Sequence, residues 1–494
     1  MRAELAPFGL DLVLGLAGLG ILVAIRAVPL RASSMVAAFG LAYLTGAAAV
    51  PLVLTILLTI GVPFTLEMFA AVAVICIGLG VALAWARGDR PPPAPDAWWR
   101  RPWRSWPADV WIVALFLVAF GIFAVVGMLD AFRVPLLGWD AWGFWARKAQ
   151  MLTWHDSLFA EFFTGLNYRF VHQDYPLQLP VFEALHFRAA GNVDTQAVGR
   201  HLWLLLVAFV WAAAYLLRDR VRPAAWAPLL LLAALAPGVW QQLLTGFADL
   251  PMAIFIGIGA IALGLWLSQD RDQGGGRFLA LAAIMLGAAA NTKNEGLMVA
   301  VALLVVAGIV GLARGLRFRP FLIACAGVAV AVLPWRIWMS ANGIKSDLPV
   351  SKGLDPGYML DRTSRIWPSI ETLGHELADQ SRWLYLLPLA AVVVLAALIS
   401  GTGRRVAAFY LAAFAVVWAG FIWSYWLSQY PIEWHLETSA NRVVSALMFI
   451  CIAAVVHVSG LLLNALVQRP RGREAEAAAP AAPAVAREPV VSND

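Results

Sequence analysis

Thirteen apolar stretches, most of them about twenty residues long, constrain this chain more than any other feature of its sequence. A membrane-spanning helix needs about 20 apolar residues, and a helix satisfies all its backbone hydrogen bonds without water. The stretches are residues 7–29, 35–60, 64–86, 108–129, 196–217, 223–240, 250–268, 278–292, 296–313, 320–340, 383–400, 405–428 and 442–466. They predict an all-α polytopic membrane protein with about 13 transmembrane helices.

Composition agrees with this class and argues against others. Hydrophobic residues make up 61% of the 494 residues and charged residues 13%, too few to cover the surface of a soluble domain of this size. The chain shows no basic and aromatic patch of the kind that binds nucleic acid. Cys76, Cys325 and Cys451 lie singly in apolar runs, so we interpret them as packing residues. The first apolar run is too long for a signal-peptide core and predicts a retained helix.

Basic clusters predict which loops share a side of the membrane. An even number of predicted helices separates each cluster from the next, so all of them fall on one side, which the positive-inside rule makes cytoplasmic. The clusters are residues 87–104, 218–222, 271–277, 314–319, 403–405 and 468–473. The opposite side, periplasmic in a bacterial inner membrane, receives residues 130–195, 241–249, 291–295, 341–382 and 429–441. The two longest of these outer segments predict short helices along the membrane surface.

The first outer segment carries two acidic motifs. In W-D-A-W-x-F-W, Asp140 lies among Trp139, Trp142 and Trp145. This pattern suits an interfacial helix with an aromatic belt and Asp140 as its N-cap, and equally a catalytic carboxylate in a site walled by indoles. Further on, His172, Asp174 and Tyr175 precede Pro176, which favours an extended backbone at Tyr175. That motif is either a turn into the next surface helix or a second acid directed at the same place as Asp140.

Charged residues also stand at the outer ends of later spans. Asp249, beside Pro251, suits a helix start through the helix dipole and suits a site equally well. In the hairpin N-T-K-N-E-G, Lys293 and Glu295 approach the hydrocarbon, where a charge costs about 2–3 kcal/mol at a helix centre and less near its ends. They form either an internal pair or part of a site.

The last two candidate cations are arginines near the outer ends of spans. Arg336 lies just inside its span and Arg442 begins the last one, close to His435. Arg442 either extends to the lipid surface or clamps a phosphate. Because the span interiors are almost uncharged while the outer ends are rich in acids and bases, the pattern favours chemistry at the outer surface over transport.

Taken together, the motifs resemble the GT-C superfamily of membrane glycosyltransferases, in the bacterial branch related to protein O-mannosyltransferases and the lipid A aminoarabinose transferase. The resemblance rests on W-D-A-W-x-F-W at 139–145, D-Y-P at 174–176, G-F-A-D-L-P at 246–251 and T-K-N-E-G at 292–296. It covers roughly residues 130–310 and extends to the rest only as architecture.

The resemblance implies a polyprenyl-phosphate-linked sugar as donor, an envelope glycan, lipid or protein as acceptor, and an inverting displacement at the periplasmic face. Asp140 would act as general base or orient the acceptor, with Asp174 as a second acid. Lys293, Arg442 and Arg336 would bind the donor phosphate. The residues implied to bind substrate are Trp139, Trp142, Trp145, His172, Tyr175, Asp249, Glu295 and His435.

The chain departs from the family in two ways. Many members have an acidic pair where Ala141 and Trp142 follow Asp140, so no cofactor or metal ligand is assigned and a divalent metal stays open. The first-loop motif follows the fourth predicted span instead of the first.

The implied domains are additional helices and a basic linker at 1–107, a GT-C-like core at 108–340, a second outer loop and C-terminal helices at 341–467, and a disordered cytoplasmic tail at 468–494. A transporter or flippase for lipid-linked saccharides and a non-catalytic scaffold are the alternatives.

Overall fold

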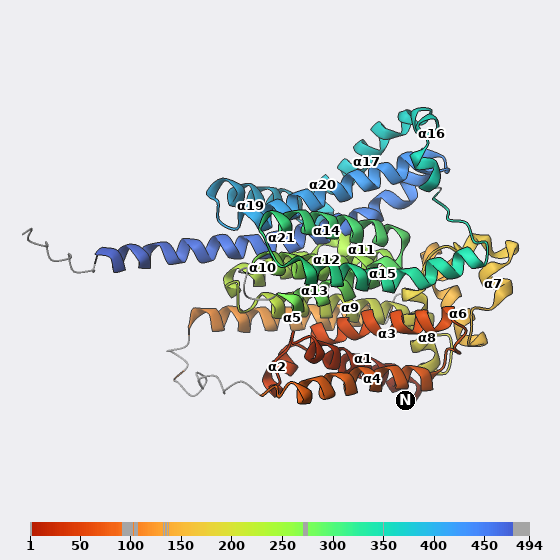
Figure 1. Ribbon diagram of the computed structural model, residues 1–494, viewed down its shortest axis with the longest axis horizontal. Helices are drawn as coiled ribbons and strands as arrows, with labels where there is room; N and C mark the ends of the chain where they lie inside the picture. The colour runs from red at the N-terminus through yellow and green to blue at the C-terminus, as the bar shows by residue number, and fades with distance from the viewer. Residues whose placement is uncertain are drawn as a thin grey trace, which may run out of the picture.

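The computed structural model describes residues 2–90, 102, 107–131, 133, 136, 138–269, 275–348 and 350–477, and every regular element in these residues is a helix (Figure 1). The first half contains α1 (Arg2–Ala24), α2 (Ala32–Ala37), α3 (Phe39–Thr59), α4 (Leu66–Ala86), α5 (Ala108–Ala131), α6 (Ala146–His155), α7 (Ala160–Thr164), α8 (Gln178–Ala190), α9 (Thr195–Leu217), α10 (Pro223–Leu235) and α11 (Pro237–Thr245). The second half contains α12 (Asp249–Leu267), α13 (Gly276–Thr292), α14 (Asn294–Ala313), α15 (Phe318–Ala341), α16 (Pro356–Leu360), α17 (Ile366–Ala378), α18 (Gln380–Trp383), α19 (Leu386–Ser400), α20 (Arg404–Leu427) and α21 (Ile432–Ala477).

The predicted all-α polytopic membrane architecture is confirmed. Among the described residues, ten helices are long and apolar enough to cross a bilayer, and the pair α10 and α11, bent by 51°, raises the number to eleven. The remaining two predicted spans coincide with α13 and α19, apolar helices of 17 and 15 residues. Every predicted span therefore has a helix, while the number that crosses the membrane stays a prediction.

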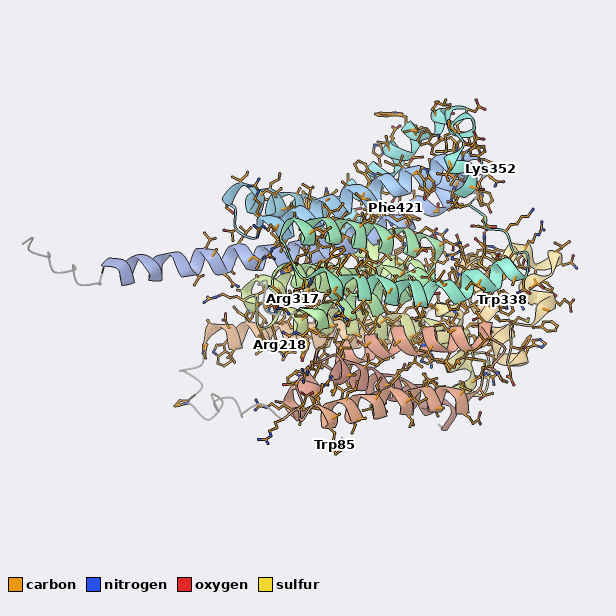
Figure 2. The ribbon with its side chains drawn as sticks, in the orientation of Figure 1. Trp85, Arg218, Arg317, Trp338, Lys352 and Phe421 are labelled. Atoms are coloured by element: carbon orange, nitrogen blue, oxygen red, sulfur yellow. The ribbon has the colours of Figure 1, made fainter. Side chains whose placement is uncertain are left out.

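The helices form one bundle around α12, which is buried along its whole length. Figure 1 shows α6, α7, α8 and α16 at one end of the bundle and the C-terminal part of α21 projecting from the other. In Figure 2, Arg218 and Arg317 of the basic clusters lie away from the end that carries Trp338 and Lys352. This separation agrees with the predicted sidedness of the loops; the compartment that each end faces stays a prediction.

The helix α8 was predicted to lie along the membrane surface, but it is sunk into the bundle. Its residues Gln178–Phe187 are all buried, and it packs on α1, α3 and α6. Pro51 inside α3 has no N–H, so the carbonyl of Ala47, four residues earlier, lacks its usual helical partner. Gln178 donates its side-chain amide to that carbonyl at 2.9 Å and to the carbonyl of Ala48 at 3.0 Å. The proline in one span thus creates the acceptor that docks an outer-segment helix.

The N-terminal helices are an integral part of this bundle. Besides α8, α3 packs against α9, α13 and α15, so the predicted additional domain at 1–107 is not peripheral. At the other end of the chain, α21 continues to Ala477, beyond position 468 where the disordered tail was predicted to begin. The rest of that tail, 478–494, and most of the basic linker, 91–101 and 103–106, lie outside the described residues.

The tight crossing of α1 and α3 gives a test of the fold. A Cβ added at Gly18 would lie 1.9 Å from the carbonyl oxygen of Ala42, whereas one added at Gly78 would meet nothing within 4 Å. We expect Gly18→Ala to force the helices apart and destabilise the protein by about 1–3 kcal/mol. Gly78→Ala, the matched control on the exposed side of α4, should leave the melting temperature in detergent unchanged or slightly raised, because alanine favours helix. Equal melting temperatures for the two variants would contradict this packing.

Candidate functional site

A cavity of about 360 Å³ lies between the first outer segment, the α13–α14 junction and the outer ends of α20 and α21. Eight of the thirteen residues proposed from the sequence line it: Trp139, Asp140, His172, Tyr175, Lys293, Glu295, His435 and Arg442. Aromatic side chains from other segments complete the wall, among them Phe247, Phe421, Tyr430 and Trp434. The fold thus joins residues some 300 positions apart into one polar, aromatic-lined site.

Asp140 and Arg442 form the ion pair on one side of this cavity. The Arg442 guanidinium donates through Nη1 to the Asp140 carboxylate and stacks over the Phe247 ring at 4.5 Å. The Asp140 side chain makes no capping hydrogen bond to the helix that follows, so the N-cap interpretation does not describe it. Arg442 points inward to an acid and therefore does not extend to the lipid surface.

The tryptophans around Asp140 have different surroundings. Of the three indoles, only Trp139 lines the cavity; Trp142 is 42% exposed and packs edge-on against Trp139. Trp145 is 1% exposed and stacks on Tyr175 with ring centroids 5.5 Å apart. The reason is a π-helical turn at Ala141–Trp145, which shifts the side-chain register relative to the 3.6-residue period of an α-helix.

Lys293 is the second cation that lines the cavity. It is the single residue between α13 and α14, and its extended backbone, with φ −154° and ψ 154°, breaks the helix there. Its ammonium lies 2.9 Å from the Asp249 carboxylate and 3.2 Å from that of Glu295. Asp249 is the first residue of α12 and does not line the cavity. Lys293 thus pairs with Glu295, as one interpretation of the sequence had it, and also with the more deeply buried Asp249. Lys293 nevertheless lines the cavity.

Asp174 faces away from this cavity, into a neighbouring one of about 340 Å³ that Arg169 and Lys345 also line. Its Oδ2 accepts hydrogen bonds from Asn294 Nδ2 at 2.7 Å and from Ser346 Oγ and the Asp347 backbone N–H at 3.2 Å each. Burial, together with the nearby Asp347 carboxylate, raises the pKa of Asp174. Asp174 is therefore a buried anchor for the segment around Asp347.

Arg336 is linked to the cavity only through a neighbour. Its guanidinium donates to Asn294 Oδ1 at 2.7 Å, and Asn294 itself lines the cavity while Arg336 does not. The side-chain amide of Asn294 therefore connects Arg336 with Asp174. This chain of hydrogen bonds orients Asn294, the residue next to Lys293.

Asp347 lines the cavity and Lys148 supports two of its lining residues, although the sequence indicated neither as a candidate. Lys148 is fully buried, and its ammonium donates to the carbonyls of His172 at 2.6 Å and Tyr175 at 3.2 Å. His172 adopts the left-handed conformation, with φ 50°, and its Nδ1 pairs with Asp347. One signal was available: in a chain that uses Arg almost throughout, only four lysines occur, at 148, 293, 345 and 352.

Three of these side chains could also hold a metal ion. One nitrogen or oxygen each from His172, Asp174 and Asp347 lies within 4.8 Å of the others. One oxygen of Asp174 already accepts three hydrogen bonds, and Lys148, in its protonated form, adds a positive charge close by. Protein groups therefore already compensate much of the negative charge in this cluster.

Comparison of the chain with models of protein families, with curated proteins and with solved structures gave no match. The candidate site is therefore interpreted from its own residues.

Lys148 makes the stability of the protein depend on pH. Burial lowers its pKa from 10.5 to about 7, so between pH 7 and 10 the unfolded chain binds one more proton than the folded one. The free energy of unfolding then rises with pH, by up to about 1.4 kcal/mol per pH unit. This gain in stability is lost as the pH falls towards 7. We expect the melting temperature to increase less between pH 7.5 and 9.5 in Lys148→Met than in the wild type.

Lys352→Met is the matched control, because Lys352 is an exposed lysine of the second outer segment. This variant should keep the wild-type pH profile. The same slope in all three proteins would show that Lys148 titrates normally.

Proposed function

We propose that this protein is an integral-membrane glycosyltransferase with a GT-C-like core, which moves a sugar from a polyprenyl-phosphate donor to an acceptor of the cell envelope. The acceptor is a glycan, lipid or protein, and the reaction takes place at the periplasmic face of a bacterial inner membrane. One observation supports this most: the Asp140 carboxylate and the cations Arg442 and Lys293 share one aromatic-lined cavity beside the outer ends of spans. A transfer from a lipid phosphate needs a base, a cation for the leaving group and an apolar wall.

In the proposed reaction, Asp140 takes the proton from the acceptor hydroxyl while that oxygen attacks the anomeric carbon. The new carbon–oxygen bond forms as the bond to phosphate breaks, and its electron pair leaves with the polyprenyl phosphate, inverting the anomeric centre. Such proton removal accelerates a reaction by about 10²–10⁴. The protonated Asp140 then returns its proton to water.

Arg442 couples the two halves of this displacement. Its Nη1 holds Asp140, and the same guanidinium lines the cavity in which the donor phosphate would bind. As negative charge develops on the leaving phosphate, the guanidinium shifts its attraction from Asp140 to the phosphate, and the carboxylate becomes a stronger base. Preorganised donors of this kind contribute most where charge develops in the transition state. Lys293, which also lines the cavity, adds a second cation.

The aromatic wall suits the remaining parts of the substrate. Trp139, Tyr430 and Trp434 offer ring faces on which the C–H groups of a sugar or a prenyl chain can pack. Glu295 and His435 supply acceptors and donors for hydroxyl groups in the same cavity. Asp174 and Arg336 act as positioning residues, because neither lines the cavity: Arg336 is bonded to Asn294, and Asp174 to Asn294 and Asp347, which do line it.

Asp140→Asn is the direct test of the proposed base. The amide keeps the shape of the side chain but cannot accept the proton, so we expect transfer from a polyprenyl-phosphate sugar to fall by about 10²–10⁴. Loss of the ion pair with Arg442 should also lower the melting temperature. Activity is followed by mass spectrometry of envelope glycans from the native host, comparing a deletion strain complemented with the wild type or the variant.

The matched control is Glu161→Gln, which makes the same chemical change at an exposed position of the same outer segment. It should restore the glycan fully. Full restoration by a well-expressed Asp140→Asn protein would rule out the assigned role of Asp140.

A flippase for lipid-linked saccharides gives the opposite result in reconstituted vesicles. Such a protein moves the lipid-linked sugar between leaflets and forms no new glycosidic bond, whereas the proposed enzyme consumes the donor and releases polyprenyl phosphate. Measuring both products in one preparation distinguishes the two functions.

A further inference from the structure

A second cluster of chemically active side chains lies among the N-terminal helices, apart from the cavity of the candidate site. Asp11 of α1, His186 of α8 and His201 of α9 are 8%, 0% and 3% exposed. One oxygen or nitrogen of each lies within 4.8 Å of the others, and the two imidazole rings have their centroids 3.4 Å apart. The proposed reaction uses none of the three.

Hydrogen bonding at His186 requires a positive charge beside Asp11. His186 Nδ1 lies 2.8 Å from the backbone carbonyl of Phe182, and since a carbonyl only accepts, Nδ1 must carry the hydrogen. In a neutral ring Nε2 then bears a lone pair, yet it lies 2.9 Å from the Asp11 carboxylate, which is also an acceptor. Two lone pairs at this distance repel unless a proton or a metal cation stands between them.

The surroundings of His201 favour a metal cation over a proton. Both of its ring nitrogens are buried and have no hydrogen-bond partner in the described part of the chain. A second proton at His186 would leave His201 as unsatisfied as before. A metal ion shared by the cluster would use one lone pair of each imidazole and an oxygen of the carboxylate, and it would give one of the two ring nitrogens of His201 a partner.

We propose that Asp11, His186 and His201 bind a divalent transition-metal ion of the zinc type. Two neutral imidazoles and one carboxylate are a ligand set that Zn²⁺ accepts. The outer partners follow the usual pattern for such sites: the Phe182 carbonyl fixes the His186 tautomer, and the Tyr43 hydroxyl donates to Asp11 at 3.0 Å.

The site fastens three segments that are distant in the sequence. It joins α1, the first helix of the chain, to α8 of the first outer segment and to α9, the span that follows it. Its role is therefore structural, and it is independent of the proposed glycosyl transfer. Loss of the metal should loosen α8 from α1 without changing the ligands of the candidate cavity.

The test uses the full-length protein, purified in detergent, treated with a chelator and then dialysed against Zn²⁺ or Co²⁺. We expect about one equivalent of metal per chain by elemental mass spectrometry, a rise in melting temperature on adding metal, and a visible absorption band with Co²⁺. His201→Gln and Asp11→Asn should each lose the bound metal and the temperature shift.

His457→Gln is the matched control, since His457 is another buried histidine that lies in α21 and contacts Tyr410 and Ser268 instead. It should keep one equivalent of metal. Absence of stoichiometric metal in the wild-type protein, or equal metal content in wild type and His201→Gln, would overturn the proposal. The wild-type measurement decides the question even if a variant fails to fold.

Discussion

The candidate site depends on the ion pair between Lys293 and Asp249. Both side chains are almost completely buried, and their charged atoms lie 2.9 Å apart. Removing one partner of such a buried pair leaves an uncompensated charge and typically costs 3–5 kcal/mol. The pair fixes the first residue of α12 against the one-residue break between α13 and α14. The rest of the cavity is assembled around these three helix ends.

Compensation of charge is the general rule at this end of the bundle. Arg442 pairs with Asp140, Lys293 with two acids, and Arg336 reaches Asp174 through Asn294. A ligand that brings its own negative charge must therefore exchange partners with a carboxylate instead of entering a purely positive cavity. Such an exchange of partners stabilises the ligand most strongly when negative charge develops on it during the reaction.

Hydropathy and charge were sufficient to predict the helices and the common end at which the motifs meet. Asp140, Lys293 and Arg442 stand at outer ends of spans, so the order of spans alone brings them together. Local backbone geometry could not be predicted from the pattern of hydropathy and charge. The π-helical turn that buries Trp145 interrupts a run that reads as an ordinary α-helix, and Asp174 turns to a second cavity because Asn294 and Ser346 hold it there. The buried position of Lys148 could not be predicted, because its acceptors are backbone carbonyls, which carry no sequence signal.

The docking of α8 onto α3 has a consequence for how the protein is made. With Gln178, Glu183 and His186 among its residues, α8 is too polar to enter a bilayer alone. It gains a place only where Pro51 has already left a carbonyl unpaired. Because α1 and α3 leave the ribosome before α8, the helices against which α8 packs are already present when α8 is synthesised. A chain started after the N-terminal helices would lack α1 and α3 and would leave the side chains of Gln178 and His186 in α8 without these partners.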